Sequence, residues 1–225
     1  PKGFGRALRA NGLSVISEVK KASPSKGLIQ PDFDPVKIAA AYEKAGAAAI
    51  SCLTEEHYFQ GSSEYLREIV ENVKIPVLRK DFIFDEYQIY EARALGADAV
   101  LLIAAVLDDN RLKTLFNLAK SLGLDVLGEA HDENEVRSLV SAGFGIIGVN
   151  NRNLKTFEVS LENTRRLSAL VPENAVFVCE SGIKGNADMR FAKSCGADAV
   201  LIGETLMRSD DKKKALETLN GEALK

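Results

Sequence analysis

Cysteine is scarce in this chain, and its few cysteines lie far apart. They are Cys52, Cys179 and Cys195, an odd number without a Cys-x-x-Cys pair. A disulfide framework uses an even number of cysteines, and a zinc knuckle uses closely spaced pairs, so neither is indicated. We therefore expect buried, reduced thiols.

An excess of positive charge and a long apolar run are also missing. The 29 Lys and Arg face 32 Asp and Glu, and the net charge of -3 gives no basic field for holding nucleic acid. The longest apolar run, residues 99–107, is far shorter than the roughly 20 residues of a membrane helix. No charged-then-apolar leader opens the chain, which begins at Pro1. We expect a cytoplasmic protein with neither nucleic acid nor membrane as partner.

Metal and nucleophile motifs are absent as well. The chain has two histidines, His57 and His131, with no third ligand at metal spacing, so we expect them on the surface or in hydrogen bonds and expect no metal. The G-x-S-x-G pattern of a nucleophile elbow is missing, which argues against covalent serine chemistry. Lysines are then the best electrophilic groups.

Short apolar runs alternate with amphipathic segments of helical length along the chain, a pattern typical of βα units around a parallel sheet. The expected strands span residues 14–20, 48–53, 76–80, 98–103, 124–129, 145–150, 175–180 and 198–203. Several expected helices begin with Asp, a residue that caps helices. These span residues 34–45, 85–95, 108–122 and 132–142.

An internal repeat fixes the number of units. A glycine ends a helix and leads into a strand at Gly46, Gly96, Gly143 and Gly196. Each period holds two βα units, so four periods predict eight, the number at which a parallel sheet closes into a barrel. With no linker in the pattern, we predict a single (β/α)₈ TIM barrel domain over residues 1–225. An open doubly wound sheet is the alternative fold.

Polar residues stand at the ends of five of these apolar strands, where an unpaired buried charge costs several kcal/mol. They are Glu18 and Lys20, Lys80 (after Arg79), Glu129, Asn150 and Glu180. The C-terminal ends of barrel strands meet at one rim, which is where such folds build active sites. An ion-pair network that only plugs the mouth explains any single residue equally well, but the set together favours function.

A phosphate site is the second signal. Ser181 and Gly182 follow the seventh strand, and Gly203 and Glu204 follow the eighth, where a short helix is expected to begin. Glycines let backbone N–H groups approach an anion, and a helix N-terminus adds a favourable dipole. The loop that begins at Ser23 after the first strand reaches the same region and is expected to act as a mobile lid.

Four segments resemble the indole-3-glycerol phosphate synthase family: EVKKASPSKG (residues 18–27), LRKDF (78–82), GVNNRNL (148–154) and ESGI (180–183). The resemblance runs over nearly the whole chain. It implies the barrel fold and a reaction of tryptophan biosynthesis, in which an anthranilate-bearing ribulose phosphate loses CO₂ and water to give indole-3-glycerol phosphate. It also implies a phosphorylated small-molecule substrate, no cofactor, and a monomer or weak oligomer.

The resemblance assigns roles to individual residues. Lys80 would be the general acid of ring closure, and Glu129 would serve as acid or base in dehydration. Lys20 would hold the anthranilate carboxylate and share acid work. Glu18, Asn150 and Glu180 would position and polarise the reacting groups. The substrate-binding residues would be Ser23, Phe59, Phe82, Arg152, Leu154, Ser181, Gly182, Gly203 and Glu204.

Two departures from the family pattern stand out. The family carries a helical extension ahead of the barrel that helps cover the substrate, and residues 1–10 are at most a remnant of it. Branched apolar residues usually flank the position of Glu129, whereas Gly128 and Ala130 do so here. Strand alternation sends both toward the helices. We therefore expect Gly128→Val to restore apolar packing, unless neighbouring helices have closed the gap.

Three alternative functions remain open. Another phosphosugar barrel enzyme, similar to phosphoribosylanthranilate isomerase, would not need Lys20, Lys80 and Glu129 together. A Schiff-base aldolase would use Lys80 as its nucleophile. Outside enzymes, a truncated barrel would serve as a non-catalytic scaffold.

Overall fold

Eight parallel strands form a closed barrel in the computed structural model, which describes residues 1–9 and 12–221. Around the barrel the order is β1-β10-β9-β8-β7-β6-β5-β4. The strands are β1 (Ser14–Val19), β4 (Ala49–Leu53), β5 (Val77–Lys80), β6 (Ala99–Ile103), β7 (Asp125–Ala130), β8 (Ile146–Asn150), β9 (Val176–Glu180) and β10 (Ala199–Ile202). All eight predicted strands are confirmed, each within a residue or so of its expected bounds.

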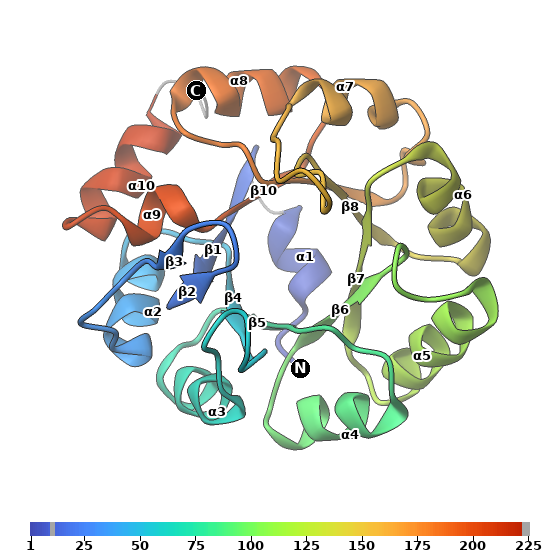
Figure 1. Ribbon diagram of the computed structural model, residues 1–225, viewed down its shortest axis with the longest axis horizontal. Helices are drawn as coiled ribbons and strands as arrows, with labels where there is room; N and C mark the ends of the chain where they lie inside the picture. Colours follow the sequence, from blue (N-terminus) through green and yellow to red (C-terminus); the bar gives the residue numbers. More distant parts are fainter. Residues whose placement is uncertain (10–11, 222–225) are drawn as a thin grey trace.

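A ring of helices surrounds the barrel (Figure 1). Its members are α2 (Pro35–Lys44), α3 (Ser63–Asn72), α4 (Glu86–Ala94), α5 (Asp109–Ser121), α6 (Glu133–Ala142), α7 (Glu162–Ser168), α8 (Asn186–Ser194), the short α9 (Glu204–Met207) and α10 (Lys212–Asn220). No helix in the described part of the chain is long and apolar enough to cross a membrane. The predicted aspartate caps are confirmed, since each accepts a backbone N–H of the first turn: Asp34, Asp85, Asp108 and Asp132.

The four repeated glycines adopt the same backbone conformation, one in each quarter of the barrel. Each follows a helix with φ between 84° and 91°, in the left-handed region that favours glycine. The chain can then reverse from the helix into the next strand. The repeat therefore marks helix-to-strand turns, as predicted.

Strand alternation separates two apolar layers. One set of side chains packs between the strands and the helices, and includes the buried Cys52 and Cys179. These two thiols and that of Cys195 form no disulfide, and Cys195 is only half-buried. The other set fills the barrel interior and includes Ile16 and Leu127. Glu18 and Glu129 lie two residues further along those strands and therefore also face inward.

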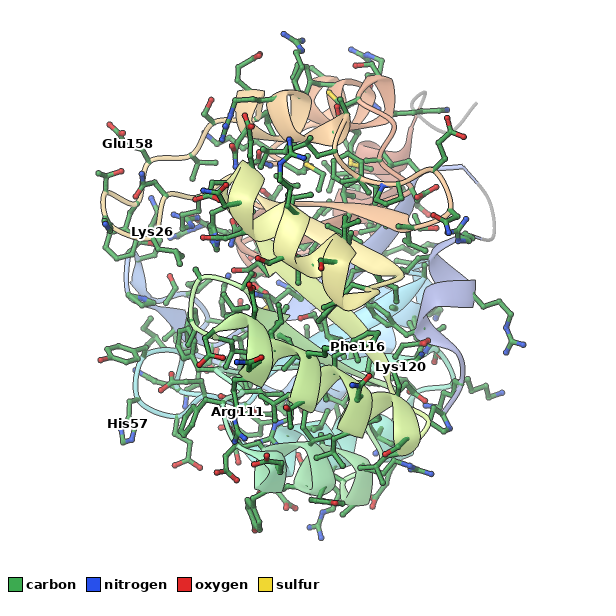
Figure 2. The ribbon with its side chains drawn as sticks, turned by 90° about the vertical axis from the view of Figure 1, so that its right-hand side faces the viewer. Lys26, His57, Arg111, Phe116, Lys120 and Glu158 are labelled. Carbon is green, nitrogen blue, oxygen red and sulfur yellow. The ribbon has the colours of Figure 1, made fainter. Side chains whose placement is uncertain are left out.

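Helix α1 (Phe4–Leu8) closes the barrel at the N-terminal ends of the strands. Phe4 and Leu8 are fully buried in the interior cluster. The backbone N–H of Gly5 donates to Asp125, the first residue of β7, at 2.9 Å. In Figure 2, α1 lies at the end opposite the loops that carry Lys26 and His57.

This placement agrees with the expectation that residues 1–10 are at most a remnant of the family's covering extension. Residues 1–9 lie at the far end of the barrel from the strand C-termini, and Ala10 lies outside the described residues. The apolar Phe4 and Leu8 indicate from the sequence that the segment is buried, without showing at which end of the barrel.

Gly128 also differs from expectation. It faces the helix layer, as predicted, but a Cβ at this position would lie 2.6 Å from Leu139 Cδ2 and 2.6 Å from Phe144 Cδ1. Phe144 in turn stacks on Phe116 of α5, with ring centroids 4.3 Å apart. These side chains have closed the gap, so the expected gain in packing from Gly128→Val is wrong.

Candidate active site

The polar strand ends meet inside the C-terminal mouth of the barrel, as predicted. Lys80 lies at the centre of the cluster, with its Nζ 3.4 Å from Glu129 Oε2 and 3.9 Å from Glu180 Oε2. Lys20 Nζ forms an ion pair with Glu18 Oε1. Asn150 pairs with Glu180 in the register between β8 and β9. Six side chains from five strands thus form one buried polar cluster.

Only one of the two basic residues at the end of β5 enters this cluster. Arg79 points the other way, toward the helices, where its guanidinium lies 3.1 Å from Asp81 Oδ2 and 2.7 Å from Glu91 Oε2. It also donates to Thr54 Oγ1 at 3.1 Å. Arg79 therefore has a structural role, whereas Lys80 faces the barrel mouth.

Two glycines make room for the carboxylates. A Cβ at Gly148 would overlap Glu180 Oε1, and a Cβ at Gly203 would overlap Glu18 Oε1. Gly148 is absent from the site predicted from the sequence, and Gly203 was expected only to approach phosphate. The sequence signal is present, since Gly148 occupies an inward position of β8, and Gly203 follows β10 two residues after the inward-facing Leu201.

Burial and neighbouring charges set the acidity of the glutamates. Burial raises the pKa of Glu180, and the nearby Glu129 carboxylate raises it further, well above its ordinary value. Neither Glu180 oxygen has a hydrogen-bond partner among the described residues. Burial also acts to raise the pKa of Glu129, but the positive charges of Lys80 and His131 outweigh it and lower that pKa. Burial and neighbouring charges therefore shift the pKa values of Glu180 and Glu129 in opposite directions.

Lys80 is a cation in this environment. Burial acts to lower its pKa, but the charges of Glu129, Glu180 and Glu18 outweigh burial and raise it. A Schiff-base lysine needs a neutral amine, which usually means a lowered pKa. The electrostatics therefore favour Lys80 as a proton donor and argue against the aldolase reading.

The loops after β9 and β10 lie together at one corner of the mouth. Ser181 and Gly182 have φ of 65° and 93°, so the chain turns sharply after β9. Thr205 Oγ1, in α9, donates to the carbonyl of Ile183 at 2.6 Å. This bond joins the turn after β9 to the helix that begins at Glu204.

The hairpin formed by β2 (Ala22–Ser23) and β3 (Gly27–Leu28) reaches the same corner. Ser23 is nearly buried at the base of this hairpin. Lys26 Nζ, on the exposed tip, lies 3.9 Å from Glu204 Oε1. The structure thus brings the predicted Ser23 loop next to the loops after β9 and β10.

The remaining predicted substrate-binding residues, Phe59, Phe82, Arg152 and Leu154, are only partly brought together. The rings of Phe59 and Phe82 lie 6.3 Å apart and are tilted by 50°. Leu154 is half-exposed in the loop after β8. Arg152, in the same loop, donates its backbone N–H to Asn150 Oδ1 at 3.0 Å. Among the described residues, no hydrogen bond or ring contact joins Arg152 or Leu154 to the two phenylalanines.

Comparisons with known proteins identify the family. The sequence profile for indole-3-glycerol phosphate synthase matches residues 2–219. The chain belongs to the indole-3-glycerol phosphate synthase family. A relative of that name from Ruminiclostridium cellulolyticum is 55% identical over 223 residues, which cover 99% of this chain and 86% of the relative. Another, from Neisseria meningitidis serogroup B, is 57% identical over 203 residues, covering 90% and 78%.

Solved structures with low identity show the fold alone. The 3-hexulose-6-phosphate synthase from Salmonella typhimurium superposes with a TM-score of 0.76 at 16% identity, over 94% of this chain and 98% of that one. The thiamine phosphate pyrophosphorylase from Pyrococcus furiosus gives 0.70 at 18% identity, over 97% and 99%. Both support the barrel, and neither bears on the chemistry.

Membership of the indole-3-glycerol phosphate synthase family makes this chain a decarboxylating lyase of tryptophan biosynthesis. That assignment replaces the isomerase-like, aldolase and scaffold readings. It also fits the cluster at the mouth, where the Lys80 ammonium stands between two carboxyl groups whose pKa values are shifted in opposite directions. Such groups can donate and accept protons without a bound cofactor.

His131 makes a contact at the mouth that the sequence does not predict. His57 is exposed, as predicted, but His131 Nε2 lies 3.4 Å from Glu129 Oε1 and its Nδ1 lies 3.1 Å from Glu135 Oε2. The hydrogen-bonding role expected for His131 is confirmed, although its contact with Glu129 was not foreseen. The sequence spacing carries a signal for this contact. Residues 129 and 131 are two apart and can face the same side of a strand, and residue 135 follows residue 131 by one helical turn.

Proposed function

We propose that this chain closes the indole ring of 1-(2-carboxyphenylamino)-1-deoxyribulose 5-phosphate, with loss of CO₂ and water, to give indole-3-glycerol phosphate. Family membership supports the reaction, and the position of Lys80 between Glu129 and Glu180 is the observation that supports the mechanism. The reaction needs a strong proton donor beside a proton acceptor in a site that excludes water.

Substrate binding uses the two sides of the mouth. Lys20 holds the anthranilate carboxylate, and Glu18 orients Lys20 through their ion pair. The sugar phosphate lies at the corner formed by the loops after β9 and β10. Binding of the phosphate involves Ser23, Ser181, Gly182, Gly203 and Glu204. Phe59 and Phe82 contact the aromatic ring of the substrate, and Arg152 and Leu154 bind it from the loop after β8.

Ring closure begins at the ketone carbon of the sugar. The anthranilate ring carbon that carries the carboxylate attacks this ketone carbon, and Lys80 Nζ donates a proton to the ketone oxygen. The bond to the carboxylate then breaks, CO₂ leaves, and its electron pair restores the aromatic ring. A positioned general acid typically accelerates such a step by about 10²- to 10⁴-fold.

Dehydration completes the indole. The hydroxyl formed in the first step leaves as water, and the carbon beside the nitrogen loses a proton. Glu129 serves in this proton transfer, because it is ionised in the free site and lies next to Lys80. Asn150 and Glu180 hold the Glu129 carboxylate in position and stabilise the charges that develop on the substrate.

The direct test is to mix the purified protein with the substrate and follow indole fluorescence together with CO₂ release. Stoichiometric formation of both products is expected. An isomerised sugar phosphate without CO₂, or no reaction under conditions where the protein is folded, would contradict the proposal.

A further inference from the structure

The reaction consumes one proton in each turnover, if the proposed function is correct. The ketone oxygen must gain two protons to leave as water, and the carbon beside the nitrogen returns one. The carboxylate leaves as neutral CO₂ and returns none. One proton from solvent must therefore reach the cluster at the mouth in every cycle.

Glu129 faces two different groups with its two oxygens. Its Oε2 lies 3.4 Å from Lys80 Nζ, inside the cluster. Its Oε1 lies 3.4 Å from His131 Nε2, on the side of α6. The side chain of Glu129 is 3% exposed, that of His131 15% and that of Glu135 19%, so exposure increases outward along this row.

The imidazole of His131 is held in a fixed orientation. Glu135 Oε2 accepts from the backbone N–H of His131 at 2.6 Å and lies 3.1 Å from its Nδ1. The carbonyl of His131 accepts from Asn163 Nδ2 at 3.1 Å. With Nδ1 hydrogen bonded to a carboxylate, Nδ1 carries the proton, and the buried Nε2 has no hydrogen-bond partner among the described residues. Nε2 is therefore free to exchange a proton with Glu129.

We propose that His131 stores the proton that each turnover consumes, and that it passes this proton to the substrate through Glu129. The Nε2–H bond of the imidazolium breaks as an O–H bond forms on Glu129. Glu135 remains ionised and keeps Nδ1 protonated throughout. Glu129 then gives the proton to the departing hydroxyl, takes one from the carbon beside the nitrogen, and returns that one to Lys80. Lys80 and Glu129 end unchanged, and His131 is recharged by water through the open mouth after product release.

The charges around His131 favour this storage. Burial acts to lower its pKa, but the hydrogen bond with Glu135 and the charge of Glu129 outweigh burial and the repulsion of Lys80, and they raise the pKa. The imidazolium is thus more populated than in a free histidine. As pH rises through the raised pKa of His131, the imidazolium loses its proton and cannot supply one to the next turnover.

His131→Gln tests the proposal, because glutamine keeps hydrogen bonding but cannot store a proton. We expect the single-turnover rate of indole formation to fall by roughly 10-fold or more, with KM within about 2-fold of wild type, since the proposal gives His131 a role only through Glu129. We expect the wild-type rate to decline as pH rises through the pKa of His131, and we expect this decline to be lost in the variant. The exposed His57→Asn is the matched control and should behave like wild type.

Chemical rescue separates storage from a structural role. His131→Gly should regain much of its single-turnover rate when free imidazole is added, and a series of substituted imidazoles should rescue according to their protonated fraction. Glu135→Gln should lower the pH at which the single-turnover rate begins to decline. Glu133→Gln, whose partner is the exposed Arg166, should leave that pH unchanged. Circular dichroism confirms that each variant is folded.

Two results would overturn the proposal. One is a His131→Gln rate and pH profile equal to wild type, and the other is a slow His131→Gly that no imidazole rescues. Product formation by the wild type tests the proposed function separately. A wild type that forms no indole would contradict the proposed function. An active wild type with unaffected His131 variants would contradict only the proposed role of His131.

Discussion

At the scale of single residues, two buried glutamates in the same cluster have pKa values shifted in opposite directions. Burial and the negative Glu129 raise the pKa of Glu180, whereas Lys80 and His131 outweigh burial and lower the pKa of Glu129. Separated acidities in one site are how enzymes place an acid and a base at the same pH. The raised pKa of Glu180 also has a cost in stability, because ionised Glu180 is less favourable in the folded protein than in the unfolded chain.

Glu180→Gln should therefore stabilise the protein at neutral pH. The folded pKa of Glu180 lies above its ordinary 4.5, so its contribution favours folding below that pH and is lost as pH rises toward the folded value. Denaturant midpoints should be similar for variant and wild type near pH 4, and the variant should gain roughly 1 kcal/mol or more at pH 7. Turnover should fall, because glutamine can neither donate nor accept a proton in the cluster.

The control for this variant is Glu162→Gln. Glu162 forms an exposed ion pair with Arg165, so its loss should change stability by less than about 0.5 kcal/mol at any pH. A Glu180→Gln variant that is less stable than wild type at pH 7 would show that Glu180 is ionised in the folded protein.

At the scale of elements, the turn after β9 and the start of α9 form the proposed phosphate corner. Gly182→Ala forces a side chain into a backbone with φ of 93° and brings its Cβ to 2.9 Å from Val159 Cγ1. Such strain costs about 1 to 3 kcal/mol, so the turn should move. We expect KM to rise by roughly 10-fold or more with a smaller effect on kcat, and inorganic phosphate to inhibit competitively but more weakly than in wild type.

Gly185→Ala is the matched control in the same loop. Its φ is that of extended backbone, and its Cβ would meet no atom within 4 Å, so KM and phosphate inhibition should stay at wild-type values. Equal KM values for Gly182→Ala and wild type, or non-competitive inhibition by phosphate, would place the phosphate elsewhere.

Strand β7 supplies a stability prediction. A Cβ at residue 128 would lie 2.6 Å from Leu139 Cδ2, which over-packs the layer between β7 and α6. Gly128→Ala should therefore lower the free energy of unfolding by roughly 1 to 3 kcal/mol, and Gly128→Val by more. Turnover per folded molecule should barely change, because the pocket lies on the other face of the strand. Gly145→Ala, which meets open space, should be neutral or slightly stabilising in the same denaturant titration.

At the scale of the whole molecule, the barrel and its mouth were largely predictable from the sequence. Glycine turns at Gly46, Gly96, Gly143 and Gly196 mark the quarters, and alternation along buried strands determines that Lys80 faces the mouth while Arg79 does not. The end of the barrel that α1 closes was not predictable, because burial of Phe4 indicates no direction. The closed gap at Gly128 was hidden for a similar reason, since it depends on the side chains of Leu139 and Phe144, which lie on other elements.

Protonation states were also beyond the sequence. They depend on distances between strands that are far apart in the chain, such as the 3.4 Å between Lys80 Nζ and Glu129 Oε2. The same holds for His131, whose contact with Glu129 depends on how the loop after β7 turns into α6. Residue types at strand ends thus predicted which groups meet, and the structure was needed to assign their charges.

The turnover of Lys80→Ala relative to wild type tests the central claim most directly. With the anthranilate sugar phosphate as substrate and indole fluorescence as the readout, the wild type should form indole-3-glycerol phosphate. The variant should be slower by roughly 10²-fold or more, with an unchanged circular dichroism spectrum. Near-normal turnover by a folded Lys80→Ala, or covalent trapping of the substrate on Lys80 by borohydride, would contradict its assignment as the proton donor of ring closure.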